Sequence, residues 1–579
     1  MKKKYIIILL ILAVIGTWNS CKSDFLDIKP AGVLDQSVLA NAKGIDAVLI
    51  GCYSLLDGWS ISDVTWGPQT SNWVYGSIRG LEANKGTTAA DQPEINPIQT
   101  YSETASNGYL NQKWRLCYEG VSRCNSLIVI ANSALADGKI DQAEADMYIM
   151  QARALRGWYH FEAWRMWEKI PYLDETTDAA TVDNEIDARP MIIADLEEGV
   201  KLLTNMGAVG RFNKTVSQVF LGKAMMQMYH DYAGALPILQ AASTGTKPDG
   251  SPIGLAPTYG EIFDIENRNK IEAILTVQYS VNDGSGGANG GYGEVLNFPY
   301  KGGGSPGGCC GFFSPSQEFV NSFRTSGGLP LLDNSYNDDP VKNDLGVVKA
   351  PLDEPDPFVR DQGPLDPRLD WSVGRRGIPY WDWGPHTGAD WVRDQTIDGP
   401  YSPKKQVYKK SQEGVYTEVG NWTSGYTANG YRMIRYADLL LLIAECQIET
   451  NDLVNAQINI NKIRARAANS AGWVKMPDGT NAANYQIAQY TTPFADKAFA
   501  EKALYMERKL ELGQEGHRWF DLNRWGITVT ELNRALNYER TMQWGDVLYG
   551  QSTVGTEDVT YPIPQRQIDL SNGKLTQNR

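Results

Sequence analysis

Helical periodicity fills both ends of this chain and is absent from a long middle segment. Over residues 112–133 apolar side chains recur every three or four positions, as on one face of an amphipathic helix, and residues 143–167 repeat the pattern. Similar patterns return after residue 436. Between residues 244 and 429, glycine clusters, prolines and short strand-like runs such as 273–279 replace them. The sequence therefore predicts a mainly α-helical scaffold that carries a large irregular insertion with short strands.

The predicted helices follow one another as antiparallel pairs, in the manner of a tetratricopeptide-like array without a strict consensus repeat. We expect residues 21–243 to form an N-terminal helical scaffold with an aromatic loop region at 57–107. Residues 244–429 form the loop-rich insertion, and residues 430–579 supply the C-terminal helices and tail of the same fold. Loops this long in a compact protein are usually functional, so we expect the insertion to bind the ligand.

The first residues have the pattern of an export signal. Three lysines at positions 2–4 precede the apolar run Ile6–Ile15, which is too short to span a bilayer. Ser20 followed by Cys21 resembles the lipobox of bacterial lipoproteins, in which the cysteine is lipidated after cleavage. We therefore expect residues 1–20 to be a lipoprotein signal peptide and Cys21 the anchor. The alternative is cleavage elsewhere, with Cys21 an ordinary thiol.

Charge and ligand-type residues argue against several classes of function. Asp and Glu (68) outnumber Lys and Arg (54), giving a net charge of −14, which opposes binding to nucleic acid. The cysteines lack zinc spacing, and the four histidines lack an HExxH motif, so we expect no metal and no cofactor. The acidic segment 333–344 echoes a calcium loop without its turn glycine, which favours a solvated loop. Adjacent Cys309 and Cys310 could be two thiols or a vicinal disulfide.

Motifs of phosphate chemistry are also missing. The chain has no P-loop and no G-x-G-x-x-G that follows a strand, and its glycine-rich stretches 284–293 and 302–311 are interpreted as flexible loops. A glycosidase carboxylate pair is defined by separation in space, so one sequence cannot reveal it. We expect a protein that is not an enzyme, with a glycoside hydrolase as the less favoured alternative.

Aromatic residues in the loops are the strongest sign of a ligand site. The chain holds 17 Trp and 29 Tyr against 14 Phe, a bias towards rings with a polar edge. Sugar rings stack on such planes, and rim polar groups bind their hydroxyls. The alternative is that these rings pack the loops onto the helices. Clustering alone gives the candidate ligand-binding residues, with Trp422 in reserve: Trp66, Trp73, Tyr75, Trp381, Trp383 and Trp391.

Five segments in order along the chain together resemble the SusD-like (RagB/SusD) family of outer-membrane lipoproteins. They are CKSDFLD (21–27), ARALRGWYHF (152–161), YRMIRYADL (431–439), ERKLEL with GHRWFDL (507–522) and YPIP with QN (561–578). Charged motif residues that lie among apolar helix positions are predicted to form partly buried ion pairs: Arg153, Arg156, Glu507, Arg508, Arg518 and Asp521.

The resemblance implies a function as well as a fold. Members capture glycans outside the cell without cleaving them, act as a hinged lid on a SusC-like TonB-dependent transporter and are tethered to the outer membrane by lipid. Some relatives capture peptides instead, which is the main alternative here, and a purely structural lid is another. Ligand sites differ from member to member, so the resemblance transfers no binding residue to this chain.

Overall fold

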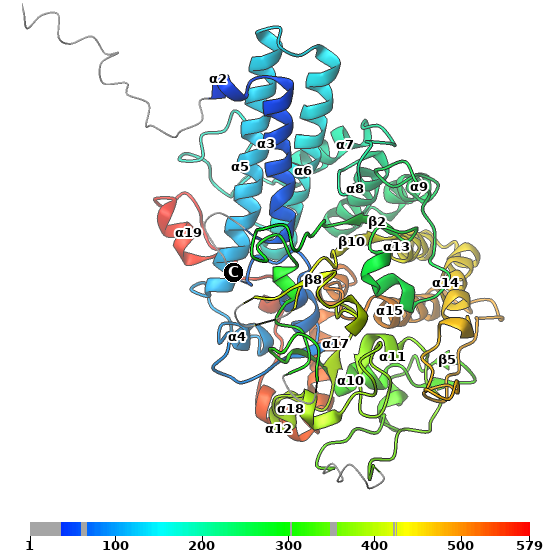
Figure 1. Cartoon of the computed structure of the whole chain (residues 1–579). Helices are drawn as coiled ribbons and strands as arrows, with labels where there is room; N and C mark the ends of the chain where they lie inside the picture. The colour runs from blue at the N-terminus through cyan, green and yellow to red at the C-terminus, as the bar shows by residue number, and fades with distance from the viewer. Residues whose placement is uncertain (1–35, 60–65, 301–303, 348–355, 421–422, 424) are drawn as a thin grey trace, which may run out of the picture.

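The computed structural model describes residues 36–59, 66–300, 304–347, 356–420, 423 and 425–579 (Figure 1). The predicted signal peptide at residues 1–20, the lipidation of Cys21 and the reserve ring Trp422 lie outside the described residues. No helix within these ranges is long and apolar enough to cross a bilayer.

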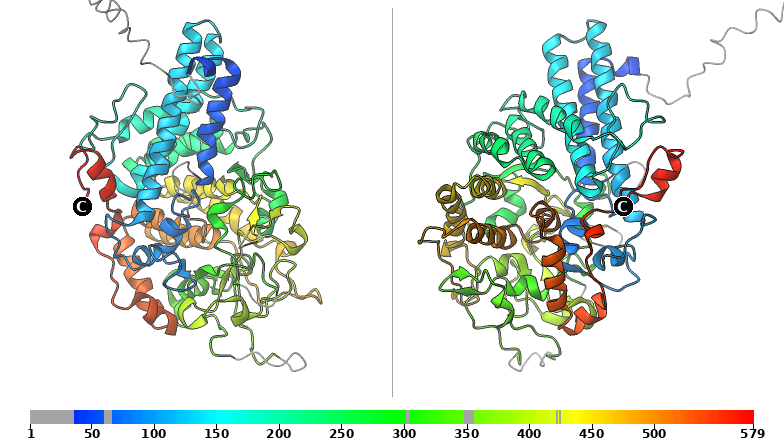
Figure 2. Two further views of the ribbon diagram at one scale, coloured as in Figure 1. Left: turned by 60° about the vertical axis from the view of Figure 1, so that its left-hand side comes forward. Right: turned by 180° about the vertical axis from the view of Figure 1, so that it is seen from behind.

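Three helices form a tower that projects from one end of the molecule (Figures 1 and 2). They are α3 (Ala42–Ser54), α5 (Gly108–Ala136) and α6 (Gln142–Trp167), and the last two match the predicted helices closely. The N-caps have a clear local cause: the side chain of Asn107 accepts the first N–H groups of α5, and Asp141 begins α6 with a capping box. The tower is thus the direct product of two long amphipathic patterns.

The remaining scaffold helices pack one after another along the chain. Helices α7 (Arg189–Val200), α8 (Lys214–Tyr229) and α9 (Tyr232–Ser243) follow the tower, and α9 packs on α13 (Tyr436–Glu449). The insertion therefore leaves the helical array between two helices that are neighbours in space. The array continues with α14 (Leu453–Ala467), α15 (Lys497–Leu512), α16 (Arg518–Arg524), α17 (Thr528–Glu539), α18 (Gln543–Tyr549) and α19 (Gln565–Leu570).

The loops are joined by short antiparallel pairs of strands, in agreement with the short strands predicted for the insertion. Strand β1 (Ala83–Gly86) of the aromatic loop region pairs with β3 (Phe312–Pro315), and β2 (Ala273–Thr276) pairs with β10 (Arg432–Arg435) next to α13. The other pairs are β4 (Thr325–Ser326) with β5 (Leu329–Pro330), β6 (Val373–Gly374) with β7 (Ser402–Pro403), and β8 (Thr417–Glu418) with β9 (Tyr426–Thr427). Short helices lie between them: α2 (Gln36–Leu39), α4 (Ile95–Gln99), α10 (Gln317–Asn321), α11 (Leu369–Ser372) and α12 (Gln395–Asp398).

The predicted ion pairs of the family motifs are present. Arg153 and Arg156 both pair with Asp195, at 2.9 and 2.7 Å. Glu507 pairs with Arg368 at 2.6 Å and with Arg464 at 2.8 Å. Arg508 pairs with Asp521 at 2.8 Å, and Arg518 pairs with Glu531 at 3.1 Å. All of these residues except Arg153 and Glu531 are buried or nearly so. The motif charges thus fix helix packing.

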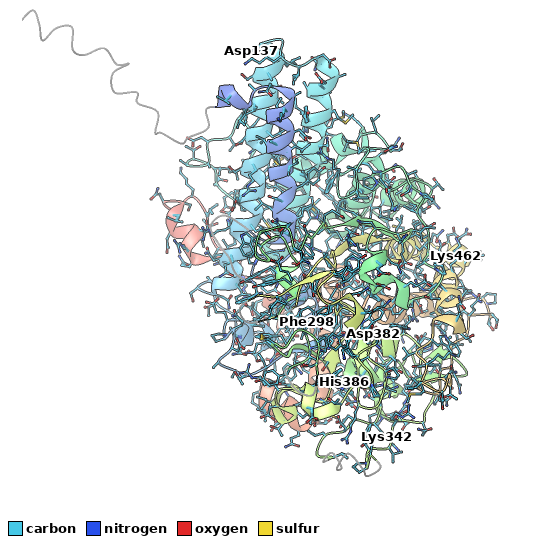
Figure 3. The ribbon with its side chains drawn as sticks, viewed as in Figure 1. Asp137, Phe298, Lys342, Asp382, His386 and Lys462 are labelled. Carbon is cyan, nitrogen blue, oxygen red and sulfur yellow. A yellow bond between two sulfur atoms is a disulfide. The ribbon has the colours of Figure 1, made fainter. Side chains whose placement is uncertain are left out.

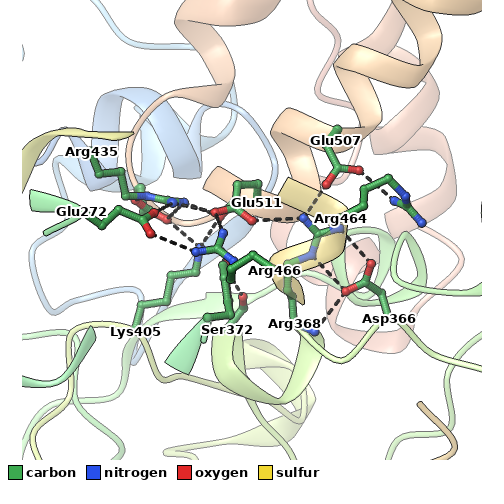
Figure 4. A network of polar contacts seen from close by, with 12 residues as sticks. Glu272, Asp366, Arg368, Ser372, Lys405, Arg435, Arg464, Arg466, Glu507 and Glu511 are labelled. Carbon is green, nitrogen blue, oxygen red and sulfur yellow. Dashed lines mark hydrogen bonds and ion pairs between the residues drawn. The ribbon is translucent and has the colours of Figure 1, made fainter. Parts of the chain in front are cut away.

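A buried charge network joins the insertion to the C-terminal helices (Figure 4). Its charges cancel, with five cations (Arg368, Lys405, Arg435, Arg464, Arg466) and five anions (Glu272, Asp366, Glu507, Glu511, Glu515). Burial by itself would raise the pKa of Glu511, but the three neighbouring guanidinium groups hold that pKa well below its usual range. A network paired this completely positions the insertion on the scaffold.

The acidic residues of the insertion do not converge on a common metal site in the described structure. In the acidic segment 333–344, Asp333 accepts the backbone N–H and the hydroxyl of Ser335, whereas Asp344 is buried beside Arg376. Among the described residues no group of three or more His, Cys, Asp or Glu could hold a metal ion. The sulfur atoms of Cys309 and Cys310 are bonded to each other, which decides between the two alternatives left by the sequence.

Candidate functional site

A small apolar cluster lies in the loop-rich half, away from the tower; Figure 3 labels its member Phe298 and, at the tip of the tower, Asp137. We call it the loop cluster. Its buried members come from separate loops: Ile265, Val295, Phe298, Tyr380, Trp391, Val407, Tyr408, Tyr426 and Ala428. Five large half-buried rings pack against it from outside: Trp66, Tyr292, Trp381, Trp383 and Tyr416. The loops therefore gather partly exposed aromatics around one point.

Three of the rings at the loop cluster stack face to face. The ring centroids of Trp66 and Tyr292 are 5.4 Å apart with planes inclined by 8°, and those of Tyr292 and Tyr426 are 6.1 Å apart at 12°. Trp59 meets Tyr292 edge-on at 4.7 Å. We call Trp59, Trp66, Tyr292 and Tyr426 the aromatic ladder. Offset stacking at these distances is favourable and joins the rings into one aromatic group with polar ring edges.

Glycine explains how the ladder can be so closely packed. Gly287 has φ +88°, which disfavours a side chain, and a Cβ built on it would lie 2.5 Å from the ring of Tyr426. The glycine-rich stretch 284–293 thus lets the backbone run directly beneath an aromatic ring. The prediction of a merely flexible loop missed this packing role.

Trp381 and Trp383 border the loop cluster on a separate loop. The indole N–H of Trp383 donates to the backbone oxygen of Tyr408 at 2.9 Å, and that of Trp381 is 3.4 Å from the oxygen of Lys404. Lys409 and Lys410 place their ammonium groups 5.6 and 5.9 Å from the rings of Trp381 and Trp383. The segment 404–410 therefore orients both rings and places a cation near each of them.

Comparison with known proteins decides the family. Residues 271–579, which are 309 of the 579 residues, match the model of the SusD family. The chain belongs to the SusD family. A SusD-like protein of Formosa agariphila is 22% identical over 595 aligned positions, which cover 100% of this chain and 99% of that protein.

Solved structures of SusD-like proteins share the fold. Surface glycan-binding protein A of Bacteroides thetaiotaomicron, solved in complex with laminarihexaose, superposes with a TM-score of 0.64 at 19% identity, covering 93% of this chain and 99% of that one. Surface glycan-binding protein A of Bacteroides fluxus gives a TM-score of 0.65 at 19% identity, covering 93% and 98%. The mainly helical SusD-like architecture expected from the sequence is confirmed.

Three of the six candidate rings are buried and so offer no face to a ligand at the surface. Trp73 is 2% exposed and donates to the backbone oxygen of Gly293, and Tyr75 is fully buried with its hydroxyl bonded to two backbone oxygens. Trp391 is 1% exposed at the centre of the loop cluster. These rings are packing wedges, the alternative that the sequence left open. Trp66, Trp381 and Trp383 are half-buried and border one cluster.

Sequence reasoning missed the central ring of the ladder in this SusD-family chain. Tyr292 touches Trp59, Trp66 and Tyr426, yet it lies inside a glycine-rich stretch that suggested only flexibility. An aromatic residue between glycines on both sides was the signal that could have identified it. Tyr416, another half-buried ring on the loop cluster, was also missed.

One half-buried and one buried carboxyl group flank the ladder in sequence. Asp57 precedes Trp59 and Glu294 follows Tyr292, each by two residues. Burial raises the pKa of Asp57 to about 7 and that of Glu294 to about 7, and the nearness of Glu294 adds to the shift of Asp57. Asp57 also lines a pocket of about 320 Å³ at the end of α3. Below neutral pH these groups are uncharged hydrogen-bonding partners beside the ladder.

Glu294→Gln tests this protonation state. The pKa of this carboxyl group is about 7 in the folded protein and about 4.5 in the unfolded chain, so stability falls as pH rises between these values. The amide removes that loss, and we expect the free energy of unfolding to rise by about 2 kcal/mol at pH 8 and to change little at pH 4. Urea denaturation at both pH values measures it. Glu197→Gln on the exposed face of α7 is the control; equal effects of both variants would contradict the assignment.

Proposed function

We propose that this protein captures oligo- or polysaccharide on the aromatic ladder and on Trp381 and Trp383, without cleaving it. The observation that carries the proposal is the row of stacked rings in the loop-rich half, in which Trp66 and Tyr292 are half-buried and Tyr426 is buried. One face of a pyranose ring is covered by C–H groups, which pack on flat aromatic surfaces. Exposed Asn289 and Asp382 lie on the same loops as these rings, exposed Lys410 lies 5.9 Å from the ring of Trp383, and all three can bind hydroxyls.

Family membership supports the wider setting of this proposal. We propose that Cys21 carries the lipid that holds the protein on the exterior face of the outer membrane. There it delivers the bound glycan to a SusC-like TonB-dependent transporter and serves as its lid. The relative solved with laminarihexaose supports glycan as the ligand class in place of peptide.

A glycoside hydrolase remains the second candidate because of one observation. Asp57 and Glu294 both have pKa values raised towards neutrality beside the ladder, and a carboxyl that is protonated near neutral pH is what glycosidases use as the acid. Hydrolysis through this pair predicts sugar release that is lost in Glu294→Gln.

Affinity electrophoresis of the mature chain from residue 22 tests capture against hydrolysis. Gels that contain plant, fungal or host polysaccharides are expected to retard the protein with at least one polymer and to release no sugar. Products at the running front would overturn the non-enzymatic proposal. Failure of every polymer, together with binding of a peptide library, would replace glycan by peptide as the cargo.

Cys21→Ala tests the lipid anchor. We expect the variant to move from the membrane fraction to the soluble fraction of fractionated cells, because the acyl chains supply the membrane affinity. Ser23→Ala, two residues further on, is the control and stays in the membrane fraction. Retention of the Cys21→Ala variant would place the anchor elsewhere.

A further inference from the structure

Arg432 differs from the other buried arginines in the part of the chain that the structure describes. Each of the others has a carboxylate oxygen within 4.0 Å: Arg79, Arg156, Arg324, Arg368, Arg375, Arg376, Arg435, Arg464, Arg466, Arg508, Arg518 and Arg524. Arg432 is 4% exposed and has no carboxylate partner among the described residues. Arg432 is thus the one buried arginine of the described chain without a counter-ion.

The hydrogen bonds of Arg432 are long and go to neutral oxygens. Its terminal nitrogens donate to Asn429 Oδ1 (3.3 and 3.4 Å) and to the backbone oxygens of Gly430 (3.2 Å) and Asp264 (3.4 Å). Its Nε has no partner in the described structure. Strong charge-assisted bonds are about 2.7–2.9 Å long. Burying a cation with contacts this weak costs several kcal/mol, and burial lowers the pKa of Arg432 to about 10.

Nearby carboxylates are engaged by other cations. The carboxylate of Asp264 is bonded to Lys409 and Gln412. That of Glu272 pairs with Arg435 at 2.9 Å and Arg466 at 3.0 Å and accepts the N–H of Ala256. Neither is available to neutralise Arg432.

A pocket of about 220 Å³ opens beside Arg432, where residues 256–273 pack against β10. Its walls are mostly apolar: Ala256, Pro257, Ile262, Ile271 and Ala273. The polar lining consists of Asn267, Glu272, Arg432 and the exposed Glu261 and Lys270. Since Glu272 is already paired, the pocket offers a buried guanidinium, a second cation at its mouth and one exposed carboxylate.

We propose that this pocket binds the carboxylate-bearing sugar unit of an acidic glycan, a uronic acid, with the carboxylate on Arg432. The guanidinium group of Arg432 lines the pocket, and its planar fork matches a planar carboxylate with two parallel bonds. Apolar walls cover the C–H groups of the ring, and Asn267 can bind a hydroxyl. The proposal rests on the proposed function, since it names the glycan class.

The position of the pocket links it to the proposed glycan surface. Its wall residues Ala256 and Ile262 belong to a small apolar cluster with Tyr259 and Phe263. Trp381 packs against this cluster as well as against the loop cluster. Trp381 therefore lies between the proposed glycan surface and the apolar cluster that forms one wall of the pocket.

Isothermal titration of the mature chain tests the pocket with free sugars, because these do not need the ladder. We expect glucuronate or galacturonate to bind and glucose, acetate and inorganic phosphate to bind at least tenfold more weakly. Arg432→Met is expected to weaken uronate binding at least tenfold. Lys270→Ala, at the exposed mouth, is expected to weaken it about threefold without touching the core. Tyr292→Ala is expected to leave it unchanged.

The titration and the affinity electrophoresis together distinguish failure of the pocket proposal from failure of the glycan-capture proposal. Retardation by neutral polymers without uronate binding would overturn the pocket and leave the glycan proposal standing. Uronate binding without retardation by any polymer would support the pocket and remove the ladder as a capture surface. Equal uronate binding by the Arg432→Met and wild-type chains would exclude this pocket, and tighter binding of phosphate or acetate would exclude uronate as its ligand.

Discussion

Arg435→Met is expected to destabilise the fold by about 3–5 kcal/mol, the range for breaking a buried ion pair on one side. Arg435 is 1% exposed and donates to Glu511 at 2.6 Å, to Glu515 at 2.8 Å and to Glu272 at 2.9 Å. Its loss leaves the network with one more negative charge than positive charges. Because the network joins the insertion to the C-terminal helices (Figure 4), we expect the two parts to unfold together at lower denaturant concentration.

Arg432→Met is the matched control, since it removes the same side chain three residues earlier on β10. Arg432 is also buried but has no carboxylate partner in the described structure, and burying its charge is costly, so we expect Arg432→Met to leave the stability unchanged or to raise it. Equilibrium denaturation followed by tryptophan fluorescence compares both variants with the wild type. Equal destabilisation by the two substitutions would mean that side-chain packing, and not the charge network, holds β10.

The fold could be predicted largely from local pattern. Helices α5 and α6 follow from apolar spacing and from caps such as Asn107, which act within a few residues. The pairing of α9 with α13 could not be predicted in this way, because almost two hundred residues of insertion separate them. Their contact depends on tertiary packing that no short window of sequence contains.

The site was predicted less well because exposure is decided by partners far away in the chain. Trp73 is buried with its indole N–H bonded to Gly293, and Trp391 is buried in a cluster whose members come from separate loops. Trp66 and Trp383 have similar sequence surroundings and stay half-buried. The sequence predicted that loop aromatics form the candidate site, and the structure selects which of them remain accessible.

Tyr292→Ala is expected to have the largest effect on glycan retention. Tyr292 is the only ring of the described ladder that contacts the other three, so alanine leaves Trp66 and Tyr426 without a continuous surface. Truncation of a central aromatic anchor costs about 2–3 kcal/mol of binding free energy. That loss corresponds to a roughly 30- to 150-fold weaker affinity. Affinity electrophoresis against the retarding polymer, with denaturation curves for each variant, measures it.

Tyr292→Phe separates the ring from its hydroxyl. It keeps the stacked plane, and we expect it to retain the glycan within about threefold of the wild type, because stacking depends on the ring face. Tyr229→Ala, which removes a ring that is 42% exposed on α8 of the scaffold, controls for the loss of any surface tyrosine. Loss of retention in Tyr292→Phe would assign binding to the hydroxyl. Loss of glycan retention in Tyr229→Ala would place the capture surface on the helical scaffold and not on the aromatic ladder.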